Sequence, residues 1–260
     1  MRRCLVGHTG FVGGNLFQQT SFDACFNSKN IREIRGQSFD EIVCAGTPGV
    51  KWKANKEPEA DKASIQLLID CLSQATASSF VFISTIDVYP VARDVDEDTR
   101  IDLEQTSPYG RHRLLVEDFA RSRFATTVLR LPGLFGPGLR KNVIFDLLND
   151  NCLDAIDPAS IFQFYDVERT WEDAQIAKRN GIALVNVATE PVSVDELARR
   201  CFDRTLPATG QPPRARYDMH SKHGRTWGQD GRYLYGKEQV LREMRRFVEG
   251  ELMRLRARTT

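Results

Sequence analysis

The glycine turn at residues 7–13 constrains the fold of this chain more than any other segment. Its sequence, Gly7-His8-Thr9-Gly10-Phe11-Val12-Gly13, follows the apolar run Cys4-Leu5-Val6 and opens an apolar-periodic segment. This order predicts a strand, a tight turn and a helix. Gly7 can adopt the backbone angles of a sharp turn, Gly10 leaves bare main chain for a phosphate, and Gly13 lets the helix pack closely on the strand. Because amides at a helix N-terminus attract anions, the turn predicts a pyrophosphate site.

The spacing of these glycines is Gly-x-x-Gly-x-x-Gly, which resembles the extended short-chain dehydrogenase/reductase family. Members of that family are epimerases, dehydratases and reductases that act largely on nucleotide sugars, and later segments of the chain resemble the family in the same order. A glycine triplet alone is also compatible with an ordinary turn, and its place after the first strand favours the dinucleotide site. The candidate cofactor contacts in the turn are Gly7, Thr9, Gly10, Phe11, Val12 and Gly13.

Length and composition limit the classes of protein that this chain can be. Its 260 residues, 41% of them hydrophobic, can bury a full core and allow one large α/β domain with a smaller annex. The net charge of +1 argues against a nucleic-acid or polyanion partner. No apolar run approaches the roughly 18 residues of a membrane span, and the chain enters a strand too soon for a signal peptide, so we expect a cytoplasmic protein.

The cysteines predict no metal site. All six lie far apart in the sequence, without a Cys-x-x-Cys pair, so zinc and redox motifs are not expected. Cys4, Cys44 and Cys71 lie in apolar runs and are interpreted as small core residues.

The end of the second predicted strand, 23–26, bears on the choice of cofactor. An enzyme that prefers NAD usually places an acid here, whereas this chain has Asn27, Ser28 and Lys29, which suit a 2′-phosphate better. We therefore expect NADP in preference to NAD, with an exposed polar turn as the alternative. Only a short helix fits between residues 31 and 37, so the sheet is expected to be trimmed on the adenine side relative to the family. Ala45 and Gly46 stand where the family carries a small pair beside the cofactor ribose.

The middle of the chain predicts a helix and a buried strand. Residues 51–53 are interpreted as a polar loop, followed by a helix from Pro58 to about Ala75. The apolar strand 80–83 delivers Thr85 to its carboxyl end, the edge where ligands bind in open α/β sheets.

Thr85 and Tyr109 form the candidate catalytic pair, since Tyr109 stands 24 positions after Thr85. In the family a Ser or Thr at this point hydrogen-bonds the substrate oxygen, and a Tyr about 24 residues later is the acid/base; the resemblance implies these roles here. Taken singly, Thr85 also reads as a hydroxyl that closes the strand end, and Tyr109 as an aromatic capping the pocket. Their order and spacing together favour catalysis.

Arg113 is the main departure from the family. A phenol with a pKa near 10 carries protons poorly at neutral pH unless a cation favours its ionised form. The family places a Lys four residues after the Tyr, which also binds the nicotinamide ribose, whereas this chain has Arg113. Arginine keeps the charge, but its flat head holds its proton permanently. Two hypotheses stay open: the site works with altered geometry, or the chain binds dinucleotide and has lost most of its chemistry.

Two further segments bear on the substrate. The 4,6-dehydratases of the family follow the Thr with an Asp-Glu pair, but this chain has Ile86 and Asp87, so elimination of water by that route is not expected. The segment 127–138, which contains Pro132, resembles the family's strand and loop beside the nicotinamide amide. Gly133 stands where many members carry an Asn or an aromatic residue that contacts the nucleotide sugar, so glycine removes that contact. Candidate substrate contacts are Asp87, Gly133 and Arg140, and the basic stretch 214–225 is a second candidate for an anion contact.

The carboxyl half is expected to form mainly a substrate annex. A strand over 161–165, a helix from about Arg169 to the Asn180-Gly181 cap, and a helix begun by the capping pair Ser193 and Glu196 are predicted there. Residues 182–187 return to the main sheet. The last helix, 237–256, carries an apolar face for docking on the annex, with a homodimer contact or a membrane-surface role as less favoured alternatives.

The predicted fold is α/β, a Rossmann-type doubly wound parallel sheet, with residues 1–141 mainly dinucleotide-binding and 142–260 mainly a substrate annex. The predicted function is NAD(P)-dependent hydride transfer to or from a carbonyl or hydroxyl carbon of a small sugar or nucleotide-sugar-like substrate. Thr85 would orient the oxygen, Tyr109 would pass the proton, and Arg113 would hold phenolate and ribose. The alternatives are a dinucleotide-binding sensor with little turnover and a nucleotide-sugar epimerase.

Overall fold

The computed structural model describes residues 1–207 and 213–259. The chain divides into two compact units, and each is described by itself. The sheet unit comprises Met1–Val91, Glu97–Leu131 and Glu168–Asn186, and the second unit comprises Ala92–Asp96, Pro132–Val167 and the chain from Val187 onward. The roles predicted for residues 1–141 and 142–260 stay predictions.

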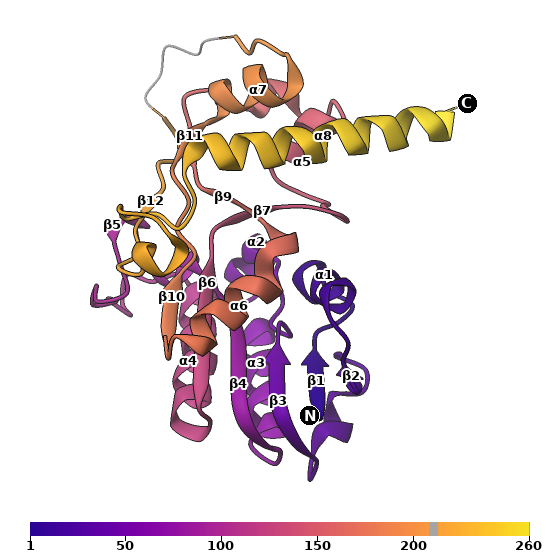
Figure 1. Ribbon diagram of the computed structural model, residues 1–260, viewed down its shortest axis with the longest axis vertical. Coiled ribbons are helices and arrows are strands. Elements are labelled where there is room, and N and C mark those ends of the chain that lie inside the picture. Colours follow the sequence, from indigo (N-terminus) through magenta and orange to yellow (C-terminus); the bar gives the residue numbers. More distant parts are fainter. Residues whose placement is uncertain (208–212, 260) are drawn as a thin grey trace. The chain divides into compact units, whose positions relative to one another are not determined.

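The sheet unit is built on six strands in the order β10-β6-β4-β3-β1-β2, and every neighbouring pair is parallel (Figure 1). The strand order reverses at β1, because β2 pairs on one side of it and β3 on the other. This confirms the predicted doubly wound parallel sheet. The strands are β1 (Arg3–Val6), β2 (Ala24–Phe26), β3 (Ser38–Cys44), β4 (Thr76–Thr85), β6 (Thr126–Leu131) and β10 (Leu184–Asn186).

Helices cover both faces of this sheet (Figure 1). On one face α1 (Phe11–Gln19) lies beside α6 (Thr170–Arg179), and on the other α3 (Pro58–Leu72) lies beside α4 (Pro108–Arg123). Short 3₁₀ helices join the strands: η1 (Ile31–Ile34) links β2 to β3, η2 (Ile86–Val88) follows β4, and η4 (Val167–Arg169) precedes α6. With only η1 between them, β2 and β3 leave no room for another strand, as the sequence predicted.

The loop predicted at residues 51–53 is wrong, because these residues begin helix α2 (Lys51–Lys56). Ala54 is its one buried residue, and α2 packs against α3 and α4. Tertiary packing therefore stabilises a helix whose polar sequence does not predict one. Pro58 does begin α3 as predicted, although α3 ends at Leu72 rather than near Ala75.

The core of the sheet unit contains the three cysteines assigned to it. Cys4, Cys44 and Cys71 are each 0% exposed, and all six cysteines are free thiols. Burial raises the pKa of the Cys44 thiol to about 12, so this thiol behaves as a small apolar group.

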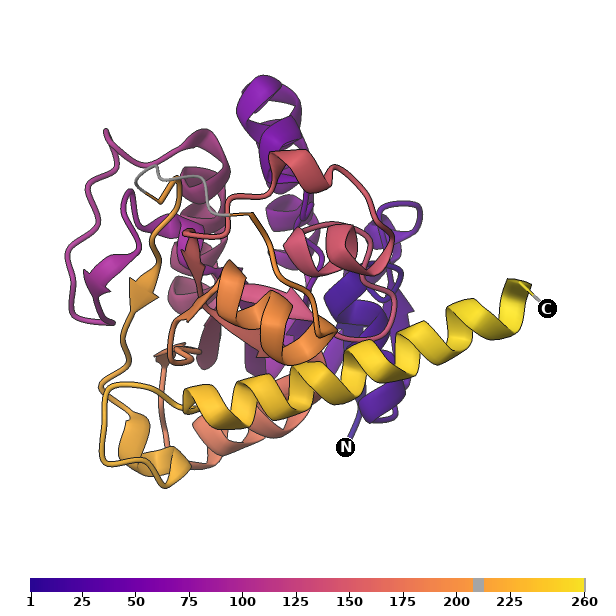
Figure 2. The same cartoon turned by 90° about the horizontal axis from the view of Figure 1, so that it is seen from above.

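Among its described residues, the second unit contains three two-stranded sheets and three α-helices. Its strands are β5 (Arg93–Val95), which pairs with β12 (Asp218–Met219); β7 (Gly133–Phe135), which pairs with β9 (Phe164–Asp166); and β8 (Ile161–Phe162), which pairs with β11 (Val192–Ser193). Its helices are α5 (Val143–Leu148), α7 (Val194–Phe202) and α8 (Lys237–Thr259), with 3₁₀ turns η3 (Leu153–Ala155) and η5 (Gly224–Trp227). Figure 2 shows α7 lying along α8.

Three predictions for the carboxyl half can be compared with these elements. The strand predicted over 161–165 is interrupted at Gln163, whose buried amide donates to the carbonyls of Thr189 and Met219. Ser193 caps α7 by accepting a hydrogen bond from the Glu196 amide at 3.1 Å, as predicted. The apolar face of α8 is buried through Val240, Leu241, Met244 and Val248, which confirms the docking interpretation. No helix among the described residues is long and apolar enough to cross a membrane.

Candidate active site

The glycines at both ends of the turn are required by close backbone packing. Gly7 has φ +93°, and a Cβ there would lie 2.4 Å from the Ala45 carbonyl oxygen. A Cβ on Gly13 would lie 2.1 Å from the Gly7 carbonyl oxygen, and one on Gly46 would lie 2.8 Å from Val6 Cγ1. These contacts hold the end of β1, the start of α1 and the end of β3 together at the point where the strand order reverses.

Gly10 differs from its neighbours because the protein itself leaves room for a side chain there. A Cβ at Gly10 would meet only the Gly7 carbonyl oxygen, at 3.4 Å. Thr9 and Gly10 are exposed, and Gly10 caps α1 without any side-chain hydrogen bond to the first turn. The first amides of a helix lack intrahelical partners, so this N-terminus, with Phe11 and Val12 half-buried beside it, is open to an anionic ligand.

Residues 27–30 form a tight polar turn after β2. Asn27 Oδ1 accepts from the Lys29 amide at 2.9 Å, and Asn30 Oδ1 accepts from the Asn27 amide at 2.7 Å. Ser28 and Lys29 are exposed. The side chain of Asn27 therefore stabilises the turn itself. The Ser28 hydroxyl and the Lys29 ammonium are the groups of this turn that lie on exposed residues.

Asp87 lies in η2 and contacts both the end of β4 and helix α2. Its amide donates to Thr85 Oγ1 at 3.2 Å, so Thr85 caps η2. This is the strand-closing role weighed for Thr85, and the hydroxyl retains its own proton for donation. The Asp87 carboxylate forms an ion pair with Lys51 of α2, with Oδ1 and Nζ 2.6 Å apart.

Tyr109 lies at the start of α4 and is buried. Ser107 caps this helix by accepting from the Gly110 amide at 3.3 Å, and the Tyr109 amide donates to Asn55 Oδ1 of α2 at 3.0 Å. Burial raises the pKa of the Tyr109 phenol; the positive charges of Arg113 and Lys51 lower it, while Asp87 and Asp61 raise it further. Two cations and two carboxylates therefore act on the pKa of this phenol.

Arg113 is bound to Asp61 of α3. Its side chain is 1% exposed, and its two terminal nitrogens donate to the two Asp61 carboxylate oxygens at 2.5 and 3.0 Å. The same guanidinium also donates to the carbonyls of Tyr109 and Pro48, and it lies over the Tyr109 ring at 3.9 Å from the centroid. Contact with a ribose would require this guanidinium to leave a buried bidentate ion pair.

Sequence reasoning missed Asp61, Asn55 and Lys51. His112 also reaches Asp61, with Nδ1 2.7 Å from Oδ2, so Asp61 binds both His112 and Arg113 of α4. Lys51 and Asn55 belong to the helix that was interpreted as a loop. Nothing in the local pattern around Asp61 marks it as a partner of a residue 52 positions away.

The other predicted residues lie in the second unit. Pro132 is buried, Gly133 is half-buried and Arg140 is exposed. A Cβ on Gly133 would lie 2.9 Å from the Gln163 carbonyl oxygen, so backbone packing explains the glycine. Within the basic stretch, His220, Lys222 and Arg225 line an open cavity of about 650 Å³, together with Asp96, Asp230 and Arg232.

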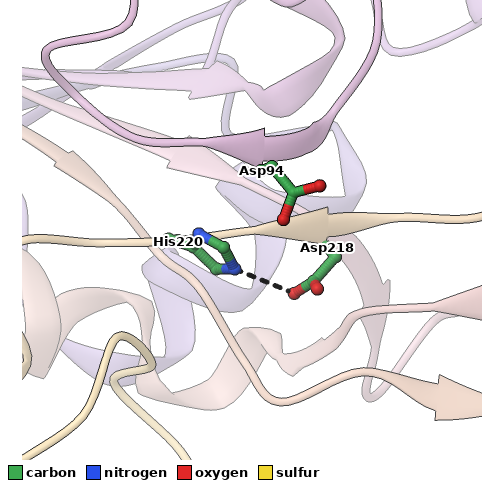
Figure 3. A group of neighbouring side chains, drawn as sticks. All are labelled: Asp94, Asp218 and His220. Carbon is green, nitrogen blue, oxygen red and sulfur yellow. Dashed lines mark hydrogen bonds and ion pairs between the residues drawn. The ribbon is translucent and has the colours of Figure 1, made fainter.

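Asp94, Asp218 and His220 form the only group of possible metal ligands found among the described residues (Figure 3). Asp218 Oδ1 already accepts from the Tyr233 hydroxyl at 2.6 Å and lies 3.2 Å from His220 Nε2. The guanidinium of Arg232 lies 3.3 Å from the same His220 nitrogen. A fixed cation beside the candidate ligand atom opposes a metal ion, so we assign no metal to this group.

Solved structures similar to this chain share its fold. MoeE5 in complex with UDP-glucuronic acid and NAD is 19% identical, with a TM-score of 0.71 over 97% of this chain and 100% of that one. RMD from Pseudomonas aeruginosa complexed with NADPH is 17% identical, with a TM-score of 0.72 over 96% and 99%. UDP-N-acetylglucosamine 4-epimerase from Methanobrevibacter ruminantium M1, in complex with UDP-N-acetylmuramic acid, is 12% identical, with a TM-score of 0.73 over 95% and 97%.

The sequence of residues 4–171 identifies the family of this chain. No curated protein matches this chain. The family model described as the NAD dependent epimerase/dehydratase family matches residues 4–171, which include the glycine turn, Thr85, Tyr109 and Arg113. Since this match covers more than half of the chain, the protein belongs to the NAD dependent epimerase/dehydratase family, a family of enzymes that use a nicotinamide cofactor.

Proposed function

We propose that this protein transfers hydride between a nicotinamide cofactor and a carbonyl or hydroxyl carbon of a sugar or nucleotide-sugar-like substrate. The observation that carries the proposal is the position of Asp87, because it contacts both Thr85 and the first turn of the helix that carries Tyr109. The Thr85 hydroxyl accepts a hydrogen bond from the Asp87 amide, and the first turn of α4, which contains Tyr109, packs on the Asp87 carbonyl. This arrangement lies at the carboxyl end of β4, the edge of an open α/β sheet where ligands bind.

The glycine turn fits the pyrophosphate of such a cofactor. A Cβ at Gly10 would meet only the Gly7 carbonyl oxygen, and the amides of the first turn of α1 have no side-chain cap. We assign the cofactor contacts to the turn and to the end of β3, at Gly7, Thr9, Gly10, Phe11, Val12, Gly13, Ala45 and Gly46. The bound nicotinamide would supply the hydride acceptor or donor.

In the proposed reaction the chain's own residues orient the substrate and move the proton. Thr85 donates its hydroxyl proton to the substrate oxygen and so orients the reacting carbon. Tyr109 accepts the hydroxyl proton when the substrate is oxidised and returns it when a carbonyl is reduced. We assign to Arg113 only the electrostatic part of its predicted role, since its guanidinium is held by Asp61. Substrate contacts at Asp87, Gly133 and Arg140 belong to the same proposal.

NADP is the favoured cofactor within this proposal. Ser28 and Lys29 are the exposed residues of the turn after β2, and no acid stands at the end of that strand to bind ribose hydroxyls. A Lys29→Met variant should weaken NADPH binding and leave NADH binding unchanged. Equal loss for both cofactors would remove the argument for the 2′-phosphate.

A second candidate is an epimerase that uses the same residues. Structures with this fold include a nucleotide-sugar 4-epimerase, and the Thr85–Tyr109 pair serves a transient oxidation equally well. An epimerase retains its cofactor through the cycle, whereas a reductase exchanges it. Cofactor that co-purifies and does not exchange would favour the epimerase. A sensor with little turnover would bind cofactor and act on no carbonyl or hydroxyl substrate in a broad panel.

The first experiment is a titration with NADPH and NADH followed by nicotinamide fluorescence, using Gly10→Ala and Gly14→Ala. Both positions accept a Cβ, with nearest contacts of 3.4 and 3.6 Å, so both variants should fold. Only the Cβ at Gly10 would occupy the space assigned to the pyrophosphate, so Gly10→Ala should weaken binding of both cofactors while Gly14→Ala binds as the wild type. Failure of the wild type to bind either cofactor would overturn the proposed function.

Location and assembly complete the proposal. We place the protein in the cytoplasm, where a reducing environment would keep its cysteines as free thiols. A small-molecule substrate is the proposed partner, without a nucleic acid or membrane. The homodimer stays a prediction for sedimentation to test.

A further inference from the structure

Arg113 stands where the family carries a Lys, one helical turn after the candidate catalytic Tyr109, and its guanidinium is bound by buried partners. Arg113 is 1% exposed and donates to both oxygens of Asp61, which is itself buried. Its positive charge is therefore balanced at short range by a carboxylate that also acts on Tyr109 with the opposite sign. A second cation that acts on the phenol from a solvent-accessible position could still respond to a bound ligand.

Lys51 is such a cation, and it is accessible to solvent. Its side chain is 45% exposed, and its ammonium lies 2.6 Å from Asp87 Oδ1. Asp87 is the residue whose amide bonds Thr85. The ammonium of Lys51 is thus held two residues after the candidate substrate-orienting hydroxyl, at the carboxyl end of β4.

Contacts of α2 and η2 with the start of α4 hold Lys51 close to the helical turn that contains Tyr109. Asn55, one turn after Lys51 on α2, accepts the Tyr109 amide at 3.0 Å. On the other side, the start of α4 lies so close to η2 that a Cβ at Gly110 would be 2.1 Å from the Asp87 carbonyl oxygen. Lys51, Asp87 and Tyr109 therefore belong to three elements that contact one another: α4 packs on both α2 and η2, and the Lys51–Asp87 ion pair joins α2 to η2.

We propose that Lys51 is a positioning residue for Tyr109, and that it supplies from α2 the primary ammonium that the chain lacks at position 113. This inference rests on the proposed function, because it assigns Lys51 to the same site. The charged groups that act on the Tyr109 phenol are Arg113 from α4, Lys51 from α2, Asp87 from η2 and Asp61 from α3. Of these four, Lys51 combines a positive charge with access to solvent, so it can respond to a bound ligand.

The test measures the ionisation of residue 109 directly in the full chain. Incorporation of 3-fluorotyrosine at position 109 lowers the pKa of the phenol into a range where the protein stays folded, and fluorine NMR follows its titration. Lys51→Met should raise that pKa, because it removes the cation and leaves Asp87 unopposed. Asp87→Asn should lower it, because it removes a carboxylate and keeps Lys51. Lys51→Arg, which retains the charge, should titrate close to the wild type.

Lys53→Met is the matched control, since Lys53 lies on the same helix and is exposed. It should leave the titration of residue 109 unchanged. In assays of substrate oxidation at neutral pH, which need the ionised phenol, Lys51→Met should lower kcat by up to roughly tenfold for each pKa unit gained by Tyr109, with KM much less affected.

Each result separates this inference from the proposed function. If Lys51→Met leaves the titration of residue 109 unchanged while NADPH still binds, Lys51 has no such role and the proposed function stands. The same conclusion follows if Asp87→Asn raises the pKa instead of lowering it. If the wild type binds no nicotinamide cofactor, the proposed function fails, whatever the titration gives.

Discussion

Gly110 and Asp87 are in backbone contact: a Cβ built on Gly110 would lie 2.1 Å from the Asp87 carbonyl oxygen and 2.8 Å from Thr106 Cγ2. This contact places the first turn of α4 directly on η2, so the positions of Tyr109 and Thr85 depend on each other. A glycine inside a helix normally costs stability, and here it is the residue that permits the approach.

Gly110→Ala should therefore damage the site more than the fold. The added methyl would push α4 away from η2 and destabilise the protein by about 1–3 kcal/mol, as overpacking does. Displacement of Tyr109 should lower kcat by a larger factor than the loss of stability explains. The control is Gly250→Ala on α8, where nothing lies within 4 Å of the added Cβ, and it should leave the melting temperature unchanged or raise it. Wild-type kcat in Gly110→Ala would contradict the coupling of α4 to η2.

Arg113 is expected to matter for stability first. Arg113→Met would leave Asp61 buried without its main partner, which should cost about 3–5 kcal/mol in urea unfolding. Arg111→Met, at an exposed position of the same helix, should change stability by less than about 0.5 kcal/mol. Arg113→Lys keeps the charge but cannot donate to both Asp61 oxygens as the guanidinium does, so it should fall between them. Tighter NADPH binding in Arg113→Lys, without loss of stability, would return position 113 to the ribose.

Glu117 allows a comparison of a buried and a surface ion pair on one carboxylate. Glu117 is 0% exposed and bonds Arg130 at 2.7 Å and Arg121 at 3.0 Å, whose side chains are 4% and 37% exposed. Arg130 also donates to the Tyr89 hydroxyl at 2.8 Å. Arg130→Met should cost about 3–5 kcal/mol of unfolding free energy, and Arg121→Met less than about 1 kcal/mol. Equal losses in chemical denaturation would show that burial does not distinguish the two pairs.

The raised pKa of Tyr109 predicts opposite pH dependence for the two directions of the reaction. Burial keeps the phenol protonated at neutral pH, and oxidation of a hydroxyl needs the ionised form to accept a proton. The rate of oxidation should therefore rise with pH up to the pKa of Tyr109, and the rate of reduction should fall only above it. Stopped-flow rates over the pH range in which the protein stays folded check this prediction, with Tyr109→Phe as the inactive reference. A reduction rate that falls as pH rises through neutrality would assign proton transfer to another group.

Most of the sheet unit could be predicted from the sequence, because its signals are local. The apolar runs before Gly7 and Thr85 identify β1 and β4. Because both strands are parallel, Gly7 and Thr85 must then lie at the same edge of the sheet, at the carboxyl ends of their strands. Helix α2 could not be predicted, since its six residues bury only Ala54 and its stability comes from contacts with α3 and α4. The same omission concealed Lys51 and Asn55.

The sequence by itself determined the glycine turn and the strand that carries Thr85. These features follow from steric rules that act over a few residues, such as the closeness of Gly13 to Gly7. Only the tertiary structure decided that Arg113 is bound by Asp61 and that Lys51 reaches Asp87. The Arg113–Asp61 pair joins positions 52 apart in the sequence and the Lys51–Asp87 pair joins positions 36 apart, so both depend on how α2, α3 and α4 pack beside the sheet. Long, flexible side chains such as those of Arg and Lys can find different partners for the same sequence pattern.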